Sequence, residues 1–170
     1  STNIALPIEL NIEDMLFKYG VRINTDLLLD LQAATLPIVT GYVGNQPKQQ
    51  MFPWYYFPLL QTDSRHPIIH NLNTVKSEFV SSIDIIESEN VNKTILLTTG
   101  KFSRIQMAPA RVSLNMLHDE PDPKLFNKHL IPVAVLLEGN FSSNYVNRIP
   151  EQLATSTEID FKKTSKPTSM

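Results

Sequence analysis

The sequence of 170 residues contains no cysteine, which excludes disulfide bonds, thiolate metal ligands and a cysteine nucleophile. Its five glycines form no G-x-G pair, so the dinucleotide-binding fingerprint and the P-loop are both absent. Neither a G-x-S-x-G nor an H-E-x-x-H motif occurs. These absences argue against several large classes of enzyme, and residue chemistry alone names no activity.

The sequence also lacks a long hydrophobic run and an excess of charge of one sign. No apolar stretch approaches the ~20 residues of a membrane-spanning helix, and no signal peptide is visible. The 15 basic and 17 acidic residues give a net charge of -2, so electrostatics predicts neither nucleic acid nor an anionic membrane as a partner. Because the chain opens with Ser1 rather than Met, we interpret it as a fragment.

The length and the 42% hydrophobic content fit one globular domain with a sizeable core. We expect that domain to cover residues 1–154. From residue 155 onward the composition turns to Ser, Thr, Lys and Pro, which predicts a mobile tail or linker over 155–170.

Two short apolar runs predict buried strands at the centre of an α/β domain with a mixed sheet. They cover residues 94–99 and 131–138, and each run ends in polar residues that include a glycine. Residues 36–43 and 49–57 flank turn residues and predict a β-hairpin extension near residues 36–60. Pro53 confines the second arm of that hairpin to an edge or a bulge.

A short helix is predicted to begin at Asn11, whose side chain can cap the first turn. Glu13 and Asp14 lie where the helix dipole favours negative charge. Lys18 falls in the last turn, and Gly20 is placed for a left-handed cap at the end of the helix.

Other segments carry weaker patterns. Residues 78–86 alternate between apolar and polar and predict a strand, as do residues 112–116. Residues 27–31 fit a strand or a helix equally well. Asp122 followed by proline predicts the start of a short helix, and a further short helix is expected over residues 143–148.

The candidate ligand site is the pair of polar segments that follow the two buried strands. In open α/β sheets, ligands bind beyond the carboxyl ends of the strands. The candidate ligand-binding residues are Lys101, Ser103, Arg104, Glu138, Asn140 and Ser142. The alternative interpretation is that these are solvated loop residues, because analogy between folds is an indirect argument.

The densest aromatic segment, residues 52–57, holds the single tryptophan. Exposed aromatic rings are typical of protein interfaces, so Trp54, Tyr55 and Tyr56 are candidate partner-binding residues. The alternative is that these rings pack against the sheet.

His66 and His70 have the spacing of paired metal ligands on a helix, but Pro67 between them favours extended backbone. We therefore expect no metal site, and no cofactor.

Six segments resemble sequence of the GldG family, the gliding-motility-associated auxiliary or substrate-binding components of bacterial ABC transporters. Together they cover most of residues 4–150, and none is a catalytic signature. The segments are NIEDMLFKYGVRIN (11–24), LPIVTG (36–41), PWYYFPLL (53–60), FVSSID (79–84), KTILLT (93–98) and IPVAVLLEG (131–139).

This resemblance implies a periplasmic module of a protein anchored in the bacterial inner membrane through segments outside this fragment. It implies an ABC permease and an ATPase as partners. It also implies the later part of a glutamine-amidotransferase-like or flavodoxin-like domain. Amidotransferase chemistry is excluded, because its nucleophile is a cysteine thiolate.

The predicted function is accordingly non-enzymatic: a periplasmic auxiliary or substrate-binding module of a gliding-associated ABC transport system. One alternative is a hydrolase or carbohydrate-active enzyme that uses Glu138 with a second carboxylate, either Asp84 or one from residues 119–122. Another is a structural spacer between membrane segments.

Overall fold

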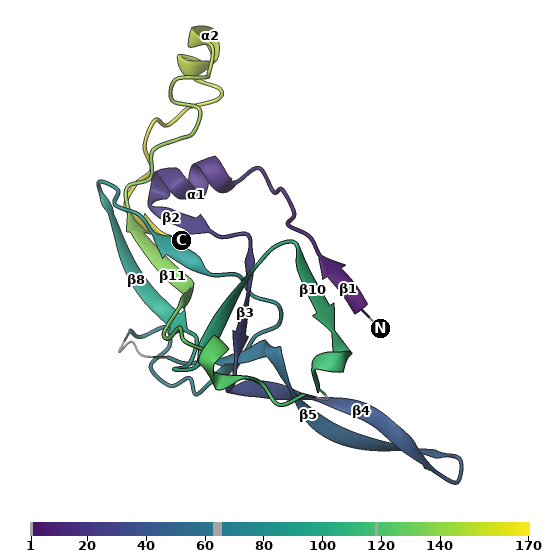
Figure 1. The fold of residues 1–170 in the computed structure, drawn as a ribbon. Helices are drawn as coiled ribbons and strands as arrows, with labels where there is room; N and C mark the ends of the chain where they lie inside the picture. The colour runs from purple at the N-terminus through teal and green to yellow at the C-terminus, as the bar shows by residue number, and fades with distance from the viewer. Residues whose placement is uncertain (1, 63–65, 118) are drawn as a thin grey trace.

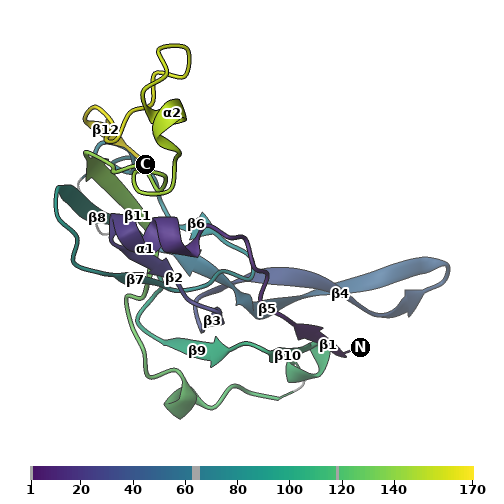
Figure 2. The ribbon, with the colours of Figure 1, turned by 90° about the horizontal axis from the view of Figure 1, so that it is seen from above.

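The computed structural model describes residues 2–62, 66–117 and 119–170. Strands predominate over helices in these residues, within the α/β class, and Figures 1 and 2 show them from two sides. The strands are β1 (Thr2–Ala5), β2 (Val21–Ile23), β3 (Asp26–Asp30), β4 (Ala33–Val43), β5 (Gln46–Leu60), β6 (Val75–Lys76), β7 (Ile83–Ile85), β8 (Val91–Thr98), β9 (Ser103–Met107), β10 (Ala110–Ser113), β11 (Pro132–Gly139) and β12 (Thr168–Ser169). The helices are α1 (Glu13–Tyr19) and α2 (Glu151–Ala154), with 3-10 turns η1 (Leu114–Leu117) and η2 (Pro123–Leu125).

Strands β8 and β11 are paired neighbours, as their apolar runs predict. They form a sheet in the order β12-β11-β8. The pairing is antiparallel, with Pro132 opposite Thr98 at one end and Gly139 opposite Val91 at the other. Each of the other strand pairs found in the described chain is antiparallel as well.

Strand β3 lies at the centre of the larger hydrophobic core and is buried along its whole length. Its three consecutive leucines cannot all face one side of a strand, so the core must cover both faces. The backbone pairs with β9, from Asp26 opposite Met107 to Asp30 opposite Ser103. Residues 27–31, which fit either a strand or a helix by sequence, therefore lie mainly in a strand.

The predicted hairpin is confirmed, and it projects from the body as a long arm of β4 and β5 (Figures 1 and 2). Gly44 has φ 60° in the connecting turn, a left-handed conformation that glycine adopts without strain. Pro53 lies opposite Thr35 beside a shift in register, which fits the bulge expected for a proline in this strand. The inner end of the arm carries the aromatic residues of the core.

Helix α1 ends as predicted but begins differently. Gly20 has φ 94° and its backbone amide donates to Leu16 and Phe17, which is a left-handed C-terminal cap. Asn11 does not cap the helix: it has φ 57°, and the residue at the cap position is Ile12. The carboxylate of Glu13 instead accepts a hydrogen bond from the backbone amide of Leu10, at 3.2 Å, and so supports the entrance of the helix.

Two other predicted strands are shorter than expected, and one predicted helix is absent from the described residues. The strand expected over 78–86 is limited to β7, because Phe79 has φ 51° and its amide donates to the carbonyl of Tyr56 on β5. The strand expected over 112–116 ends at Ser113, where η1 begins. Asp122 caps η2, as predicted, whereas residues 143–148 form turns rather than a helix.

Residues near the carboxyl end of the chain return to the central sheet. Strand β12 pairs with β11, with Glu138 opposite Ser169 and Gly139 opposite Thr168. Met170 exchanges two backbone hydrogen bonds with Leu137, at 2.8 and 2.9 Å. The expected boundary near residue 154 stays a prediction, although residues 168–170 are part of the sheet of β8 and β11.

Candidate functional site

The structure separates the two polar segments that were expected to form one ligand site. Because β8 and β11 are antiparallel, their carboxyl ends lie at opposite ends of the sheet. Lys101, Ser103 and Arg104 therefore follow one end, while residues 138–142 lie at the other. The expectation of one shared pocket was wrong, because it assumed that the two strands run in the same direction.

Ser103 is fully buried and belongs to a structural hydrogen-bond network. Its hydroxyl lies 2.7 Å from a carboxylate oxygen of Asp30 and 2.8 Å from the hydroxyl of Thr99. The same carboxylate oxygen accepts the backbone amide of Gly100 at 2.7 Å, and its other oxygen accepts the amide of Gln32 at 2.8 Å. These bonds hold together the ends of β3, β8 and β9, and they leave the Ser103 hydroxyl without access to a ligand.

The second group also makes mainly structural contacts. Glu138 is exposed, and its neighbours across the sheet are uncharged, Asn92 on β8 and Ser169 on β12. Asn140 donates its backbone amide to Asn90, and Ser142 forms a bridge to Thr164. A ligand-binding role for these residues stays a prediction.

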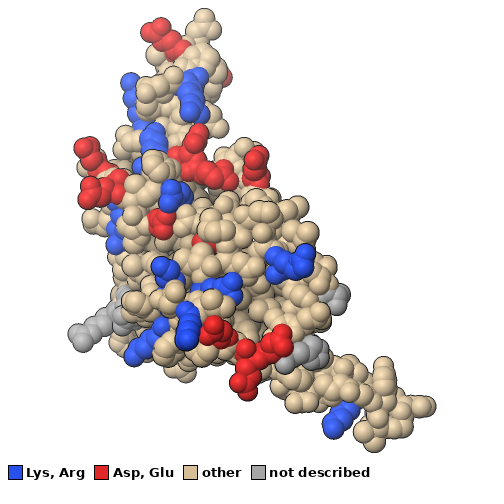
Figure 3. All heavy atoms as spheres, viewed as in Figure 1, with Lys and Arg blue, Asp and Glu red and all other residues tan. Residues whose placement is uncertain are grey.

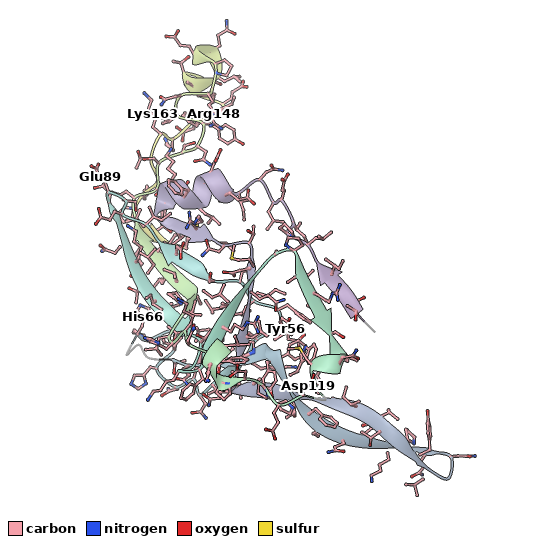
Figure 4. The ribbon with its side chains drawn as sticks, in the orientation of Figure 1. Tyr56, His66, Glu89, Asp119, Arg148 and Lys163 are labelled. Atoms are coloured by element: carbon pink, nitrogen blue, oxygen red, sulfur yellow. The ribbon has the colours of Figure 1, made fainter. Side chains whose placement is uncertain are left out.

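The aromatic segment of β5 is part of the core, so its predicted partner-binding role is corrected for two residues. Trp54 and Tyr56 are buried, and Tyr55 packs its ring edge-on against Phe126 at 5.9 Å between centroids. Figure 4 shows Tyr56 inside the body, close to the base of the arm. Burial raises the pKa of Tyr56, partly offset by the positive charge of Arg104 and by the hydrogen bond to Gln106.

A groove with a volume of about 570 Å³ lies between the amino-terminal segment and the body of the protein. One wall is formed by residues 5–8 and Leu10, another by α1, and the remainder by residues 22–27 with Phe79, Ser81 and Ala108. Phe79 also packs against Tyr56 and Phe57, with ring centroids 5.8 and 5.3 Å apart. The groove is thus supported directly by the aromatic core.

Residues 6–9, which we call the strap, form the most exposed wall of this groove. The strap joins β1 to the entrance of α1 and makes no backbone hydrogen bond within the described part of the chain. Every second residue from 4 to 10 has a bulky apolar side chain, and these four side chains are between 61% and 79% exposed. These side chains are Ile4, Leu6, Ile8 and Leu10. The alternation is visible in the sequence, and reading it would have found this surface.

A few polar groups lie along the apolar groove. Backbone hydrogen bonds from Glu13 itself and from Leu10 lower the pKa of Glu13, which favours its ionised form. Arg22 forms an ion pair with Asp84 on the neighbouring strand β7. The carboxylate of Asp26 is occupied by the backbone amide and the hydroxyl of Ser82, at 2.8 and 2.6 Å. The groove therefore offers a mainly apolar surface, with the carboxylates of Glu13 and Asp14 at the wall formed by α1.

Neither a cluster of metal ligands nor a membrane-spanning helix is found in the residues that the structure describes. Among them, no group of three or more His, Asp and Glu side chains is arranged to hold a metal ion. Across the same ranges, no helix combines the length and the apolar character needed to cross a bilayer.

Comparison with known proteins identifies one family. The family described as an ABC-type uncharacterized transport system, an auxiliary family of ABC transporters, matches residues 1–170. No curated protein and no solved structure matches the chain.

Proposed function

The chain belongs to the family described as an ABC-type uncharacterized transport system, and from this membership we propose that it is a non-enzymatic auxiliary module that captures an extended apolar polypeptide segment. The captured segment belongs to another component of the transporter. It lies in the groove between the strap and the body.

The observation that carries this proposal is the unpaired strap beside an apolar groove. In an extended chain, each residue directs its N–H and its C=O toward one edge, and every second residue uses the same edge. In an extended strap, Leu6 and Ile8 would therefore present their backbone donors and acceptors on one edge. Pro7, which lacks an N–H, weakens only the opposite edge. An added strand would pair with the complete edge and place alternate side chains in the groove, as in other cases of strand addition.

The apolar lining supplies the affinity for such a segment. Burial of apolar surface stabilises a complex by about 25 cal/mol per Å², which favours aliphatic or aromatic side chains in the captured segment. Backbone pairing then sets its direction and register. The carboxylate of Asp26 is already hydrogen bonded to Ser82, so the charged groups of the groove that remain for a captured segment lie on α1, at Glu13 and Asp14.

Family membership implies association with transporter components. We extend the proposal to the identity of these components and to the cellular location of the module. The partner is the permease, acting with its ATPase. The module works on the periplasmic side of a bacterial inner membrane, anchored through segments outside residues 1–170. The relation to gliding-associated GldG proteins and to flavodoxin-like domains is also part of this proposal, supported by the segments of similar sequence.

The geometry does not favour the two alternatives. A glycosidase requires a second carboxyl group across a cleft from Glu138, at roughly 5–10 Å. Glu138 is instead flanked across the sheet by Asn92 and Ser169, and Asp84 is paired with Arg22. A simple spacer would not need a groove with apolar walls.

Co-elution of the chain with the detergent-solubilised permease and ATPase tests the proposal. We expect Ile8→Asp to weaken binding by roughly tenfold or more, because a carboxylate would enter an apolar interface. Val43→Asp is the matched control, since Val43 is also strongly exposed but lies near the tip of the arm. Absence of binding by the unmodified chain, or equal loss in both variants, would overturn the proposal.

A further inference from the structure

Three exposed lysines each have an exposed bulky apolar residue within two positions, and the fold joins the two segments that carry them. Lys101 precedes Phe102, Lys124 precedes Leu125, and Lys128 lies two residues before Leu130. The apolar side chains are 59%, 48% and 42% exposed, respectively. We call this set of six residues the lysine–apolar surface. It is separate from the groove, with which it shares no residue.

Backbone hydrogen bonds hold the two segments of this surface side by side. Ser103 and Lys128 exchange two bonds, at 2.8 and 2.9 Å, and the amide of Leu130 donates to Gly100 at 3.0 Å. Phe126, between the two lysines of the second segment, is buried in the core and anchors that segment. The surface is therefore a fixed feature of the fold, built from residues more than twenty positions apart in sequence.

The positive charge of the three lysines is not neutralised by direct ion pairs. None forms an ion pair or a side-chain hydrogen bond with another residue that the structure describes. Arg104 and His129 lie in the same two segments. The acidic residues of the adjoining 119–122 loop include Asp122, which accepts the backbone amide of Lys124. In Figure 3, Lys and Arg side chains gather on the lower part of the body, beside a group of acidic side chains near the arm.

The backbone at Leu130 adds a second observation. Its φ is 50°, in the left-handed region, which is unfavourable for a residue with a branched side chain. Strained conformations of this kind persist where the surrounding structure enforces them, and they are frequent at functional sites. Here the strain accompanies a leucine side chain that is 42% exposed.

We propose that the lysine–apolar surface binds the headgroup region of a membrane that contains anionic phospholipids. The ammonium groups would lie near lipid phosphates, while Phe102, Leu125 and Leu130 enter the boundary between headgroups and acyl chains. Charge complementarity identifies the lipid as anionic. The net charge of the whole chain is -2 and conceals this local excess of positive charge.

The interleaved apolar side chains favour a membrane over an acidic protein as the occupant. An acidic protein segment would satisfy the lysines but would leave three bulky apolar side chains in water. At a bilayer interface, the same side chains are removed from water as the lysines meet phosphate. The attraction between lysine and phosphate and the removal of apolar surface from water then both favour membrane binding.

Co-sedimentation with vesicles tests this proposal. Vesicles of phosphatidylcholine alone are compared with vesicles of equal parts phosphatidylcholine and phosphatidylglycerol. We expect binding to the second kind only, weakened by salt because exposed charges are screened. Replacing Lys101, Lys124 and Lys128 with Gln should weaken binding by about fivefold for each lysine. Phe102→Ser should weaken binding while leaving its salt dependence in place.

A charge-matched control separates this surface from general electrostatics. The variant with Lys162, Lys163 and Lys166 changed to Gln has the same net charge but alters the carboxyl-terminal region. We expect it to bind vesicles as the unmodified chain does, and circular dichroism checks that all variants are folded. Absence of binding to phosphatidylglycerol, or equal loss in both triple variants, would overturn the proposal. So would salt-sensitive binding to polyglutamate without binding to vesicles, which would identify an acidic protein as the occupant. Transporter co-elution does not enter this test, so the two proposals can fail separately.

Discussion

Asp30 and Ser103 face each other across the pairing of β3 with β9, and their side chains are joined by a hydrogen bond of 2.7 Å. Both residues are fully buried. The Asp30 carboxylate also accepts two backbone amides, so three donors converge on one buried acidic group. A carboxylate with this many donors is stabilised without a cationic partner. The polar residues at the end of β8 therefore organise the core, whereas their sequence position indicated a ligand site.

Changing Asp30 to Asn tests this structural role. The amide retains the shape of the carboxylate but places an NH₂ group where an acceptor is needed, so one buried donor loses its partner. We expect the free energy of unfolding to fall by about 3 kcal/mol, as measured by urea denaturation. Glu158→Gln, in an exposed turn, is the matched control and should change it by less than about 0.5 kcal/mol. A small effect at Asp30 would contradict the assigned role.

Gly139 allows close approach between the end of β11 and Asn90. A Cβ atom at this position would overlap the backbone carbonyl oxygen of Asn90, and φ is 152°. We expect Gly139→Ala to lower the free energy of unfolding by roughly 2–4 kcal/mol, since the backbone must shift to relieve the overlap. Gly41→Ala is the control, because an added methyl group there would meet no atom within 4 Å and should be nearly neutral. Chemical denaturation of both variants measures the difference.

Tyr56 should make stability depend on pH in the alkaline range. Burial raises the pKa of its hydroxyl above the ordinary value of 10.0. In the unfolded chain the hydroxyl ionises first, so the stability it contributes is complete below about pH 10. That stability is then lost as pH rises toward the pKa of the folded state. We expect Tyr56→Phe to show a smaller decline over this range in pH-dependent urea denaturation.

At neutral pH, Tyr56→Phe should lower the free energy of unfolding by about 1 kcal/mol, because the 2.7 Å hydrogen bond to Gln106 is lost. Equal alkaline declines in the two proteins would show that Tyr56 does not titrate as inferred. Tyr145→Phe, at an exposed position, serves as the control.

Hydrogen exchange should distinguish the strap from the core. The amides of Leu6, Ile8 and Glu9 have no backbone acceptor in the described residues, so we expect them to exchange fastest. The amide of Leu28 donates to Val80 from a fully buried residue and should be among the slowest. Addition of the transporter should protect Leu6 and Ile8, if the strap gains a paired strand. If the exchange rates of the Leu6 and Ile8 amides stayed the same when the transporter bound, the contact would lie elsewhere on the chain.

Several elements could be predicted because their signals are local. The left-handed cap at Gly20 follows from a glycine directly after an amphipathic helix, and the turn at Gly44 follows from clustered turn residues. Strands β8 and β11 follow from short apolar runs, although both are only partly buried and Ile95 is exposed. In each case neighbouring residues carry enough information to identify the element.

The strand predicted over residues 78–86 is limited to β7, because contacts with distant segments decide its extent. Its alternating pattern is genuine, but Phe79 and Val80 make backbone hydrogen bonds to β5 and β3 that bend the chain. Those partners lie more than twenty residues away along the chain. Alternation indicates which side chains are buried, and it does not report where the backbone groups find their partners.

The sequence by itself determined that β8 and β11 are strands, where the long arm turns and where α1 ends, because apolar runs, glycine and proline act over a few residues. Only the tertiary structure decided that β8 and β11 run in opposite directions, since strand direction depends on pairing between distant segments. The pairing of β3 with β9 carried Ser103 into the core, and the antiparallel pairing of β8 with β11 separated it from Glu138. Tertiary contacts also placed Lys101 next to the segment of Lys128 and Leu130, creating a positively charged surface on a chain whose net charge is negative.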